Sequence, residues 1–193
     1  MVKTGRMAGR FPNVHLNENG RQQAQNLADH LAKIPFTAIY SSPLERAVET
    51  AKPLSDTLSI PIKINDGFLE TNIGDWTGQE LKKIRKLKEW KTVTEIPSRF
   101  QFPNGESFHE CQFRLVFQLE LILKTHTDKE IIAIFSHADP IKLITAYYLG
   151  MPLDNFQKLS CDTGSVTIWS ISPDNSSLIK QNQQVPVDFQ LRK

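Results

Sequence analysis

The alternation of apolar and polar positions predicts helices and strands in turn along most of the chain. Between residues 17 and 33, apolar side chains recur every three or four positions, which is typical of a helix with one buried face. We expect further helices over residues 43–58, 79–90, 107–126 and 140–149. Loop composition marks residues 1–16, residues 68–76 and a lid-like segment at 97–105.

Short apolar or alternating runs predict strands at residues 37–40, 61–64, 131–135 and 165–171. The run at 131–135 is apolar throughout, as expected for a strand covered on both faces of a parallel sheet. Because helices and strands alternate, we predict a three-layer α/β sandwich, in which a mostly parallel sheet has helices on both faces. The polar tail, residues 173–193, is expected to fray at its end and to carry little functional information.

Polar side chains follow two of the predicted strands. Ser41 and Ser42 come after the strand at 37–40, and Ser136 and His137 come after the strand at 131–135. Ligands of α/β proteins bind outside the carboxyl ends of parallel strands, so we expect both pairs to face one crevice. Ser42 also fits the N-cap of the following helix, with proline at N1 and glutamate at N3, and capping accounts for this serine.

Arg46 and His137 are the candidate anion-binding residues of that crevice. Arg46 lies in the first turn of a helix, where its guanidinium and the free backbone N–H groups converge on one anion. The alternative is a surface arginine that pairs with Glu45 or Glu49. His137 either donates to an oxyanion, with added charge when protonated, or serves as a structural histidine that bonds a nearby carbonyl.

Glu70 is the candidate proton donor, although a glutamate in a loop is usually just solvated. Beside a bound phosphate its carboxyl group can protonate a leaving oxygen, provided that burial or the neighbouring dianion raises its pKa. The remaining histidines fit structural or solvated positions better than catalytic ones: His15, His30, His109 and His126.

Composition narrows the class of protein. A chain of 193 residues with 39% hydrophobic side chains fits one globular domain, and its net charge of +2 does not suggest a surface for nucleic acid or anionic lipid. No apolar run approaches the roughly 18 residues that span a bilayer, and the start of the chain lacks the apolar stretch of a signal peptide. The two cysteines form no C-x-x-C motif and no histidine pair has metal-site spacing. We therefore expect a cytoplasmic protein with reduced thiols and no metal or cofactor.

Motifs along nearly the whole chain resemble, in order, those of the histidine phosphatase superfamily, which includes cofactor-dependent phosphoglycerate mutases and many small phosphatases. They are GRMAGR at 5–10, LNENGR at 16–21, YSSPLERA at 40–47, LE at 69–70, GDWTG at 74–78, PNGES at 103–107, SHAD at 136–139 and DTGS at 162–165. The resemblance implies a phosphoglycerate mutase-like fold. It also implies that Arg46 is the second phosphate-binding arginine, Glu70 the proton donor and His137 the second pocket histidine, with further phosphate contacts from Arg6 and Gly9.

The superfamily's nucleophile belongs to an Arg-His-Gly motif at the end of a first strand, and the present sequence contains no Arg-His-Gly. The resemblance places that strand inside the sheet, so its neighbours are expected to keep unpaired backbone groups. We interpret residues 1–193 as a single, N-terminally truncated domain in which Met1 is an internal methionine. Val2 replaces a frequent phosphate-binding asparagine, and Asp139 adds an acid that disfavours highly anionic substrates.

The resemblance implies a phosphomonoester phosphatase that acts through a phosphohistidine on the missing histidine, with Glu70 first donating a proton and later activating water. Two alternatives stay open: a phosphoglycerate mutase-type phosphotransferase and a catalytically inactive phosphate-binding remnant. The segment at 74–78 is typical of the phosphatases. The expected partner is a small phosphorylated metabolite, with no nucleic acid and no membrane, and residues 79–107 are expected to determine which one.

Overall fold

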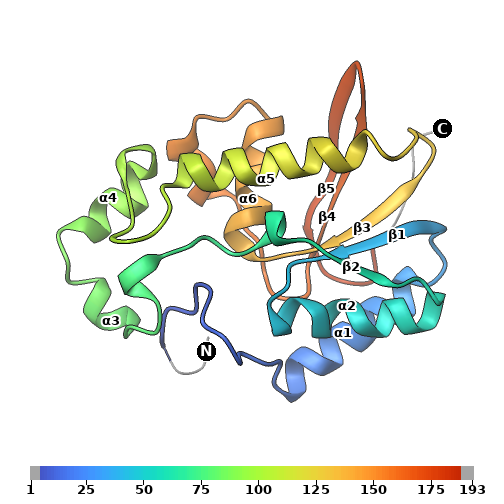
Figure 1. Ribbon diagram of the computed structural model, residues 1–193, viewed down its shortest axis with the longest axis horizontal. Coiled ribbons are helices and arrows are strands. Elements are labelled where there is room, and N and C mark those ends of the chain that lie inside the picture. The colour runs from blue at the N-terminus through green and yellow to red at the C-terminus, as the bar shows by residue number, and fades with distance from the viewer. Residues whose placement is uncertain (1–4, 188–193) are drawn as a thin grey trace.

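The computed structural model describes residues 5–187, so Met1 and Val2 lie outside the described residues. Helices and strands follow one another as Figure 1 shows. The helices are α1 (Glu18–Leu31), α2 (Glu45–Leu58), α3 (Leu81–Ile84), α4 (Glu89–Glu95), α5 (Phe108–Leu123) and α6 (Ala138–Tyr148). The strands are β1 (Phe36–Ser41), β2 (Ile62–Ile64), β3 (Ile131–Phe135), β4 (Val166–Ser172) and β5 (Asn175–Gln183).

A parallel sheet of three strands, in the order β2-β1-β3, forms the middle layer, with α1 and α2 on one side and α5 and α6 on the other (Figure 1). Side chains of β1 alternate between the two outer layers, because neighbouring residues of a strand point to opposite faces. Ala38 and Tyr40 pack with residues of α5 and α6, whereas Ile39 packs with residues of α1 and α2. The predicted α/β fold is confirmed.

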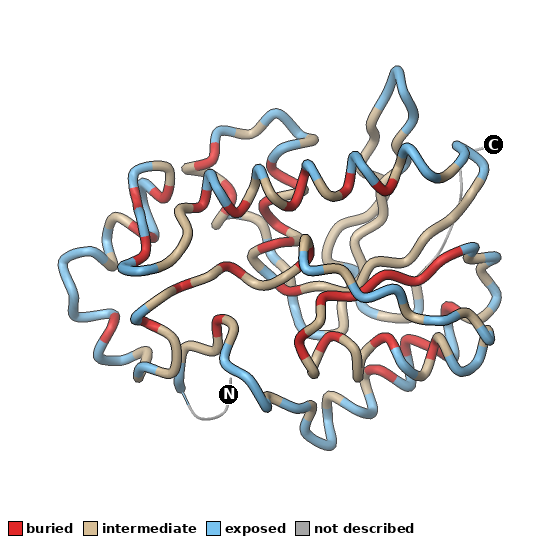
Figure 2. Tube along the Cα trace, in the orientation of Figure 1, coloured by how far each residue is buried: buried red, intermediate tan, exposed pale blue. Residues whose placement is uncertain are grey.

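β3 and β4 contribute to the same two layers without a hydrogen-bond ladder between them. β3 pairs with β1, whereas β4 pairs with β5 in a separate antiparallel sheet. Ile134 of β3 and Ile171 of β4 pack against the core beneath α5 and α6, and Phe135 and Val166 pack against the core beneath α1 and α2. All five residues of β3 are only half-buried, in contrast to the buried end of β1 (Figure 2).

Three sequence predictions about local structure were wrong. The tail was expected to carry no strand, yet Asn175–Gln183 pairs with β4 as β5, and this strand is held by its backbone ladder more than by an apolar face; the end of the tail lies outside the described residues. The expected helix at 79–90 is interrupted between α3 and α4, where closely spaced lysines and arginines repel one another. The segment at 97–105 is anchored in the core, since Phe100 and Phe102 are buried and their rings pack against Trp76.

Within residues 5–187, none of the helices combines the length and the apolar character needed to cross a membrane.

Candidate active site

The carboxyl ends of β1 and β3 meet at Ser42 and His137, as the sequence predicted. The Ser42 N–H donates to the Phe135 carbonyl at 2.9 Å, and the Ser42 Oγ lies 2.8 Å from His137 Nε2. Both residues are buried. The prediction that Ser42 caps the next helix was wrong, because α2 begins two residues later, with Leu44 at its N-cap and no side-chain cap bond. The serine hydroxyl serves the histidine instead.

Ser42 Oγ connects the start of the next helix to His137. It accepts from the Leu44 N–H at 3.4 Å, and it either donates to His137 Nε2 or accepts from it, according to the tautomer of the histidine. Burial, followed by the positive charges of Arg46, Arg114 and Arg10, lowers the pKa of His137 to about 3. The imidazole is therefore neutral at pH 7 and carries a single N–H, which is on Nδ1 when Ser42 donates to Nε2. In that tautomer His137 offers its Nδ1–H to an anion.

Arg46 supplies a second donor in the first turn of α2. Its Nη2 donates to the Gly9 carbonyl at 2.8 Å, whereas its Nη1 is buried and has no hydrogen-bond partner among the described residues. Burial lowers the pKa of Arg46 against the charges of Glu70 and Glu45, yet an arginine stays charged at any working pH. A buried guanidinium N–H without a partner is costly, so this atom is poised to receive an anion.

Arg46 is not a surface arginine that pairs with Glu45 or Glu49. Glu45 Oε1 accepts from the Asn13 N–H at 3.1 Å, and Glu49 accepts from the Leu16 N–H at 2.7 Å. Among residues 5–187, no ion pair joins Arg46 to either glutamate. The guanidinium instead lies against the N-terminal loop.

Gly9 is the residue of that loop which supports Arg46. Its φ is +45°, and an added Cβ would lie 2.6 Å from Ile73 Cγ1, so only glycine fits this position. Because the Gly9 carbonyl accepts from Arg46, the backbone here fixes the direction of the guanidinium.

Glu70 lies in the loop that follows β2, and its protonation suits a proton donor. Burial, together with the charge of Asp139, raises the pKa of its carboxyl group to about 8. A hydrogen bond from the Thr71 N–H at 2.9 Å and the charges of Arg46 and Lys142 act in the opposite direction. Asp139 itself pairs with Lys142 at 2.8 Å. At pH 7 the Glu70 carboxyl group is therefore mostly protonated.

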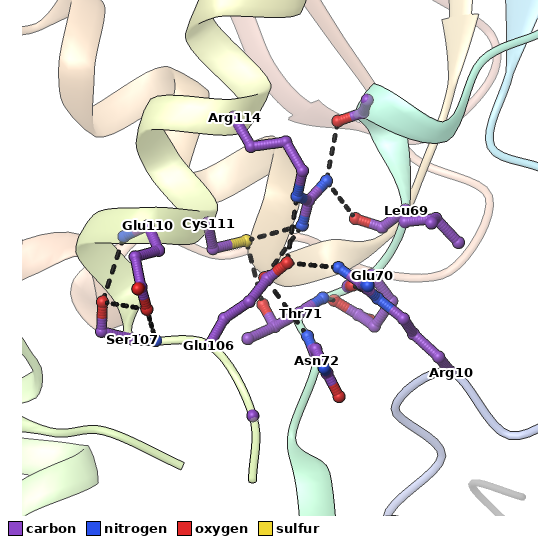
Figure 3. Close-up of polar contacts among 12 residues, drawn as sticks. Arg10, Leu69, Glu70, Thr71, Asn72, Glu106, Ser107, Glu110, Cys111 and Arg114 are labelled. Atoms are coloured by element: carbon purple, nitrogen blue, oxygen red, sulfur yellow. Dashed lines mark hydrogen bonds and ion pairs between the residues drawn. The ribbon is translucent and has the colours of Figure 1, made fainter.

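A network of two arginines around one carboxylate contacts the backbone of the Glu70 loop (Figure 3). Arg114 Nη2 donates to Glu106 Oε2 at 3.0 Å, and Arg114 Nη1 donates to the carbonyls of Gly67 and Leu69. Arg10 pairs with the other oxygen of Glu106, and its Nε donates to the Glu70 carbonyl at 2.8 Å. Sequence reasoning missed this network, although Arg10 and Glu106 both lie in the motifs quoted above.

Comparison with known proteins identifies the family of this site. A model of the histidine phosphatase superfamily (branch 1) matches residues 2–184. The chain therefore belongs to the histidine phosphatase superfamily.

Relatives in this superfamily are named as phosphatases. The chain is 27% identical to phosphoserine phosphatase 1 of Hydrogenobacter thermophilus over 169 residues, which is 86% of this chain and 80% of that protein. It is 30% identical to glucosyl-3-phosphoglycerate phosphatase of Mycolicibacterium vanbaalenii over 161 residues, or 80% and 71% of the two chains. The structure of Bacillus stearothermophilus YhfR superimposes with a TM-score of 0.85 at 26% identity, covering 92% of this chain and 89% of YhfR.

The superfamily resemblance also pointed to Arg6, which lies in a different setting from Arg46. Arg6 is exposed, its Nη1 donates to the Gly78 carbonyl at 2.8 Å, and its backbone forms a bridge with Glu80. No hydrogen bond within residues 5–187 links Arg6 to Arg46 or His137. A phosphate contact from Arg6 stays a prediction.

The other histidines of the chain do not contact Ser42, and three of them contact other residues. His15 Nδ1 is 2.5 Å from Glu49 Oε1, His30 Nδ1 contacts the Asn26 carbonyl, and His126 Nε2 is 2.9 Å from the Tyr40 hydroxyl. His109 is exposed on α5. In the part of the chain that the structure describes, His, Cys, Asp and Glu side chains form no group that could hold a metal ion.

Proposed function

We propose that this site hydrolyses the phosphate monoester of a small metabolite through a phosphohistidine intermediate. The observation that carries the proposal is the convergence of an unpartnered Arg46 Nη1, a neutral His137 and a protonated Glu70. Arg46 and His137 bind the phosphoryl oxygens and stabilise the negative charge of the transition state. The relatives named as phosphoserine and glucosyl-3-phosphoglycerate phosphatases support a small phosphorylated substrate.

The two chemical steps use Glu70 first as an acid and then as a base. A histidine nitrogen attacks phosphorus, the P–O ester bond breaks, and the Glu70 proton passes to the leaving alcohol oxygen. Water then attacks the phosphohistidine, its proton returns to the Glu70 carboxylate, and the P–N bond breaks. The raised pKa of Glu70 supports both roles near neutral pH.

The open edge of β3 supports a location for the nucleophile, which the present sequence does not include in an Arg-His-Gly motif. β3 and β4 pack into the same two core layers but belong to separate sheets. An extended apolar strand between them would pair with both edges. Lying parallel to β3, it would bring its carboxyl end beside His137, where a terminal histidine faces the phosphoryl group.

The test combines the 193-residue chain with a synthetic peptide of five apolar residues followed by Arg-His-Gly. We expect the mixture to hydrolyse p-nitrophenyl phosphate, and a matched peptide ending in Arg-Asn-Gly to leave it inactive, since loss of a comparable nucleophile costs about a million-fold in turnover. Equal activity with both peptides would contradict the proposal, as would failure of the chain to bind inorganic phosphate in calorimetry.

A second candidate is a phosphate-binding protein without turnover. The absence of Arg-His-Gly from the sequence favours it, together with the engagement of His15, His30 and His126 elsewhere. It predicts binding of phosphate or vanadate with no phosphohistidine. Hydrolysis of a phosphate monoester by the chain alone, abolished in His137→Ala, would rule this candidate out.

A further inference from the structure

We propose that the exposed face of α5 binds the same face of a second copy of this chain. Five residues form this face, which we call the α5 stripe: Glu110, Phe113, Phe117, Leu121 and Lys124. The two helices run antiparallel across a two-fold axis that passes next to Phe117. The inference goes beyond the proposed function, because it assigns a surface that the reaction does not use.

The middle of the α5 stripe is apolar and exposed. Phe113 is 72% exposed and Phe117 is 54% exposed, and their rings stack with centroids 5.9 Å apart. Leu121 lies one turn further along the helix and is 40% exposed. The opposite face of α5 packs in the core, so burial within the chain does not account for these three side chains (Figure 2). Single exposed apolar residues are common, but a contiguous row marks a surface that another molecule covers.

A groove of about 490 Å³ runs beside the stripe, between α5 and α6. The residues that line it are mainly apolar or aromatic: His109, Gln112, Phe113, Val116, Phe117, Glu120 and Tyr147. Tyr147 of α6 is 51% exposed, so the apolar surface extends from one helix to the next. A hollowed apolar surface suits the insertion of side chains from a partner, since the centres of protein interfaces are packed in this way.

The spacing of the stripe favours a second copy of the chain as that partner. Its members are separated by 3, 4, 4 and 3 positions, a series that is the same in both directions along the helix. An antiparallel copy centred on Phe117 therefore places Phe113 opposite Leu121 of the second copy. Phe117 then lies opposite Phe117 of the second copy. A two-fold contact requires such a surface, because the same patch must match itself.

The charged residues at the two ends of the stripe match in the same arrangement. Glu110 lies in the first turn of α5 and Lys124 is its C-cap residue, so an antiparallel copy brings each of them beside the other. Opposite charges across an interface fix the register of two partners. A parallel copy would bring Glu110 against Glu110 and Lys124 against Lys124, where like charges repel. The charges therefore select the antiparallel arrangement.

Both charged side chains are available to a second copy. The hydrogen bonds of the Glu110 carboxylate within residues 5–187 are all made by Oε2, which leaves Oε1 without a partner in this range. Hydrogen bonds from Ser107 lower the pKa of Glu110, so its carboxyl group is ionised. Lys124 is exposed and forms no ion pair in the part of the chain that the structure describes.

Sedimentation equilibrium of the 193-residue chain, over micromolar to submillimolar concentrations, tests the contact. We expect a monomer–dimer equilibrium. Phe117→Glu places two carboxylates at the two-fold axis and should weaken the dimer about a hundredfold. Lys124→Glu replaces two attractions by two repulsions and should weaken it about tenfold.

Glu110→Gln should act in opposite directions in two backgrounds. In the unmodified chain it removes an attraction to Lys124 and should weaken the dimer. In the Lys124→Glu chain it removes a repulsion and should strengthen the dimer. Glutamine keeps the role of Glu110 in the capping box of α5, so the helix is retained. An effect of the same sign in both backgrounds would overturn the antiparallel arrangement.

Lys33→Glu is the matched control, because Lys33 is an exposed lysine just beyond the end of α1, and the dissociation constant should not change. Urea denaturation checks that each variant is folded, and Lys124→Glu carries the test if Phe117→Glu does not fold. A chain that is monomeric throughout the concentration series would overturn the proposal and leave the stripe to a different protein. Self-association that is unchanged in Phe117→Glu and Lys124→Glu would also overturn it, and would indicate pairing through the open edge of β3.

Discussion

β1 and β3 are neighbours in the same parallel sheet, and both are largely apolar, yet they differ in burial. The last four residues of β1 are buried, whereas every residue of β3 is half-buried (Figure 2). β1 has a strand on each side, and β3 has one on the side of β1. The comparison shows that an apolar sequence indicates that a strand is suited to a buried position. How far the strand is buried depends on which strands lie next to it.

Truncation of matched isoleucines would test this difference most directly. Ile39 of β1 is fully buried, and we expect Ile39→Ala to lower the free energy of unfolding by about 3 kcal/mol, because the lost contacts leave a cavity. Ile132 of β3 is half-buried, so Ile132→Ala should cost only about 1 kcal/mol. Urea denaturation measures both. Equal losses would show that the open edge of β3 does not weaken its packing.

The candidate site at the ends of these strands contains two groups whose titration should change the stability of the protein in opposite directions. The folded pKa of Glu70 is about 8, above its ordinary value of 4.5, so the folded state holds an extra proton between these values. The folded pKa of His137 is about 3, below its ordinary 6.5, so the unfolded state holds an extra proton in that window. Of these two groups only Glu70 still contributes above pH 6.5, and stability falls as the pH rises to about 8; the raised pKa of His15, which pairs with Glu49, adds a slope of the same sign.

We therefore expect Glu70→Gln to flatten the dependence of the unfolding free energy on pH between about 6.5 and 8. Urea denaturation at several pH values across this window measures the slope. Glu18→Gln, at an exposed carboxyl group on α1, is the control and should leave the slope unchanged. A slope in Glu70→Gln as steep as in the unmodified chain would contradict the raised pKa of this residue.

The smallest expected effect concerns the link between the two strand ends. Ser42→Ala removes the hydroxyl that lies 2.8 Å from His137 Nε2, and we expect inorganic phosphate to bind about fivefold more weakly, as loss of one hydrogen bond implies. Nitrogen NMR of His137 should show a single tautomer in the unmodified chain and a mixture of the two in Ser42→Ala. Ser41→Ala is matched in burial, but its Oγ donates to the Ser42 carbonyl, so phosphate affinity should be retained. A single tautomer in Ser42→Ala would refute the positioning role.

The sequence was sufficient to predict features that depend on local periodicity and on the direction of strands. The apolar run of β3, the helices around it and the meeting of Ser42 with His137 all follow from such patterns. Capping residues around Ser42 also satisfied a local pattern, but α2 begins at Glu45 and the Ser42 hydroxyl contacts His137, 95 positions away. Strand direction predicted that these two residues meet, whereas no local rule predicts that the hydroxyl contacts the ring instead of capping the helix.

The Arg10–Glu106 pair and β5 escaped prediction for similar reasons. Arg10 and Glu106 are 96 positions apart, and each alone resembles an ordinary surface charge. β5 has a largely polar sequence, which does not predict a strand, and it is formed by hydrogen bonding to β4. Both features depend on contacts between distant parts of the chain and not on the intrinsic preferences of the residues.

Ser42 belongs to the sheet and to the pocket at the same time. Its N–H completes the connection between the ends of β1 and β3, and its hydroxyl holds His137. An anion that engages His137 therefore also opposes the local opening that exposes this amide to solvent. The Ser42 amide should therefore exchange its hydrogen more slowly when an anion is bound. Its exchange rate measures anion binding at this site even when no reaction takes place.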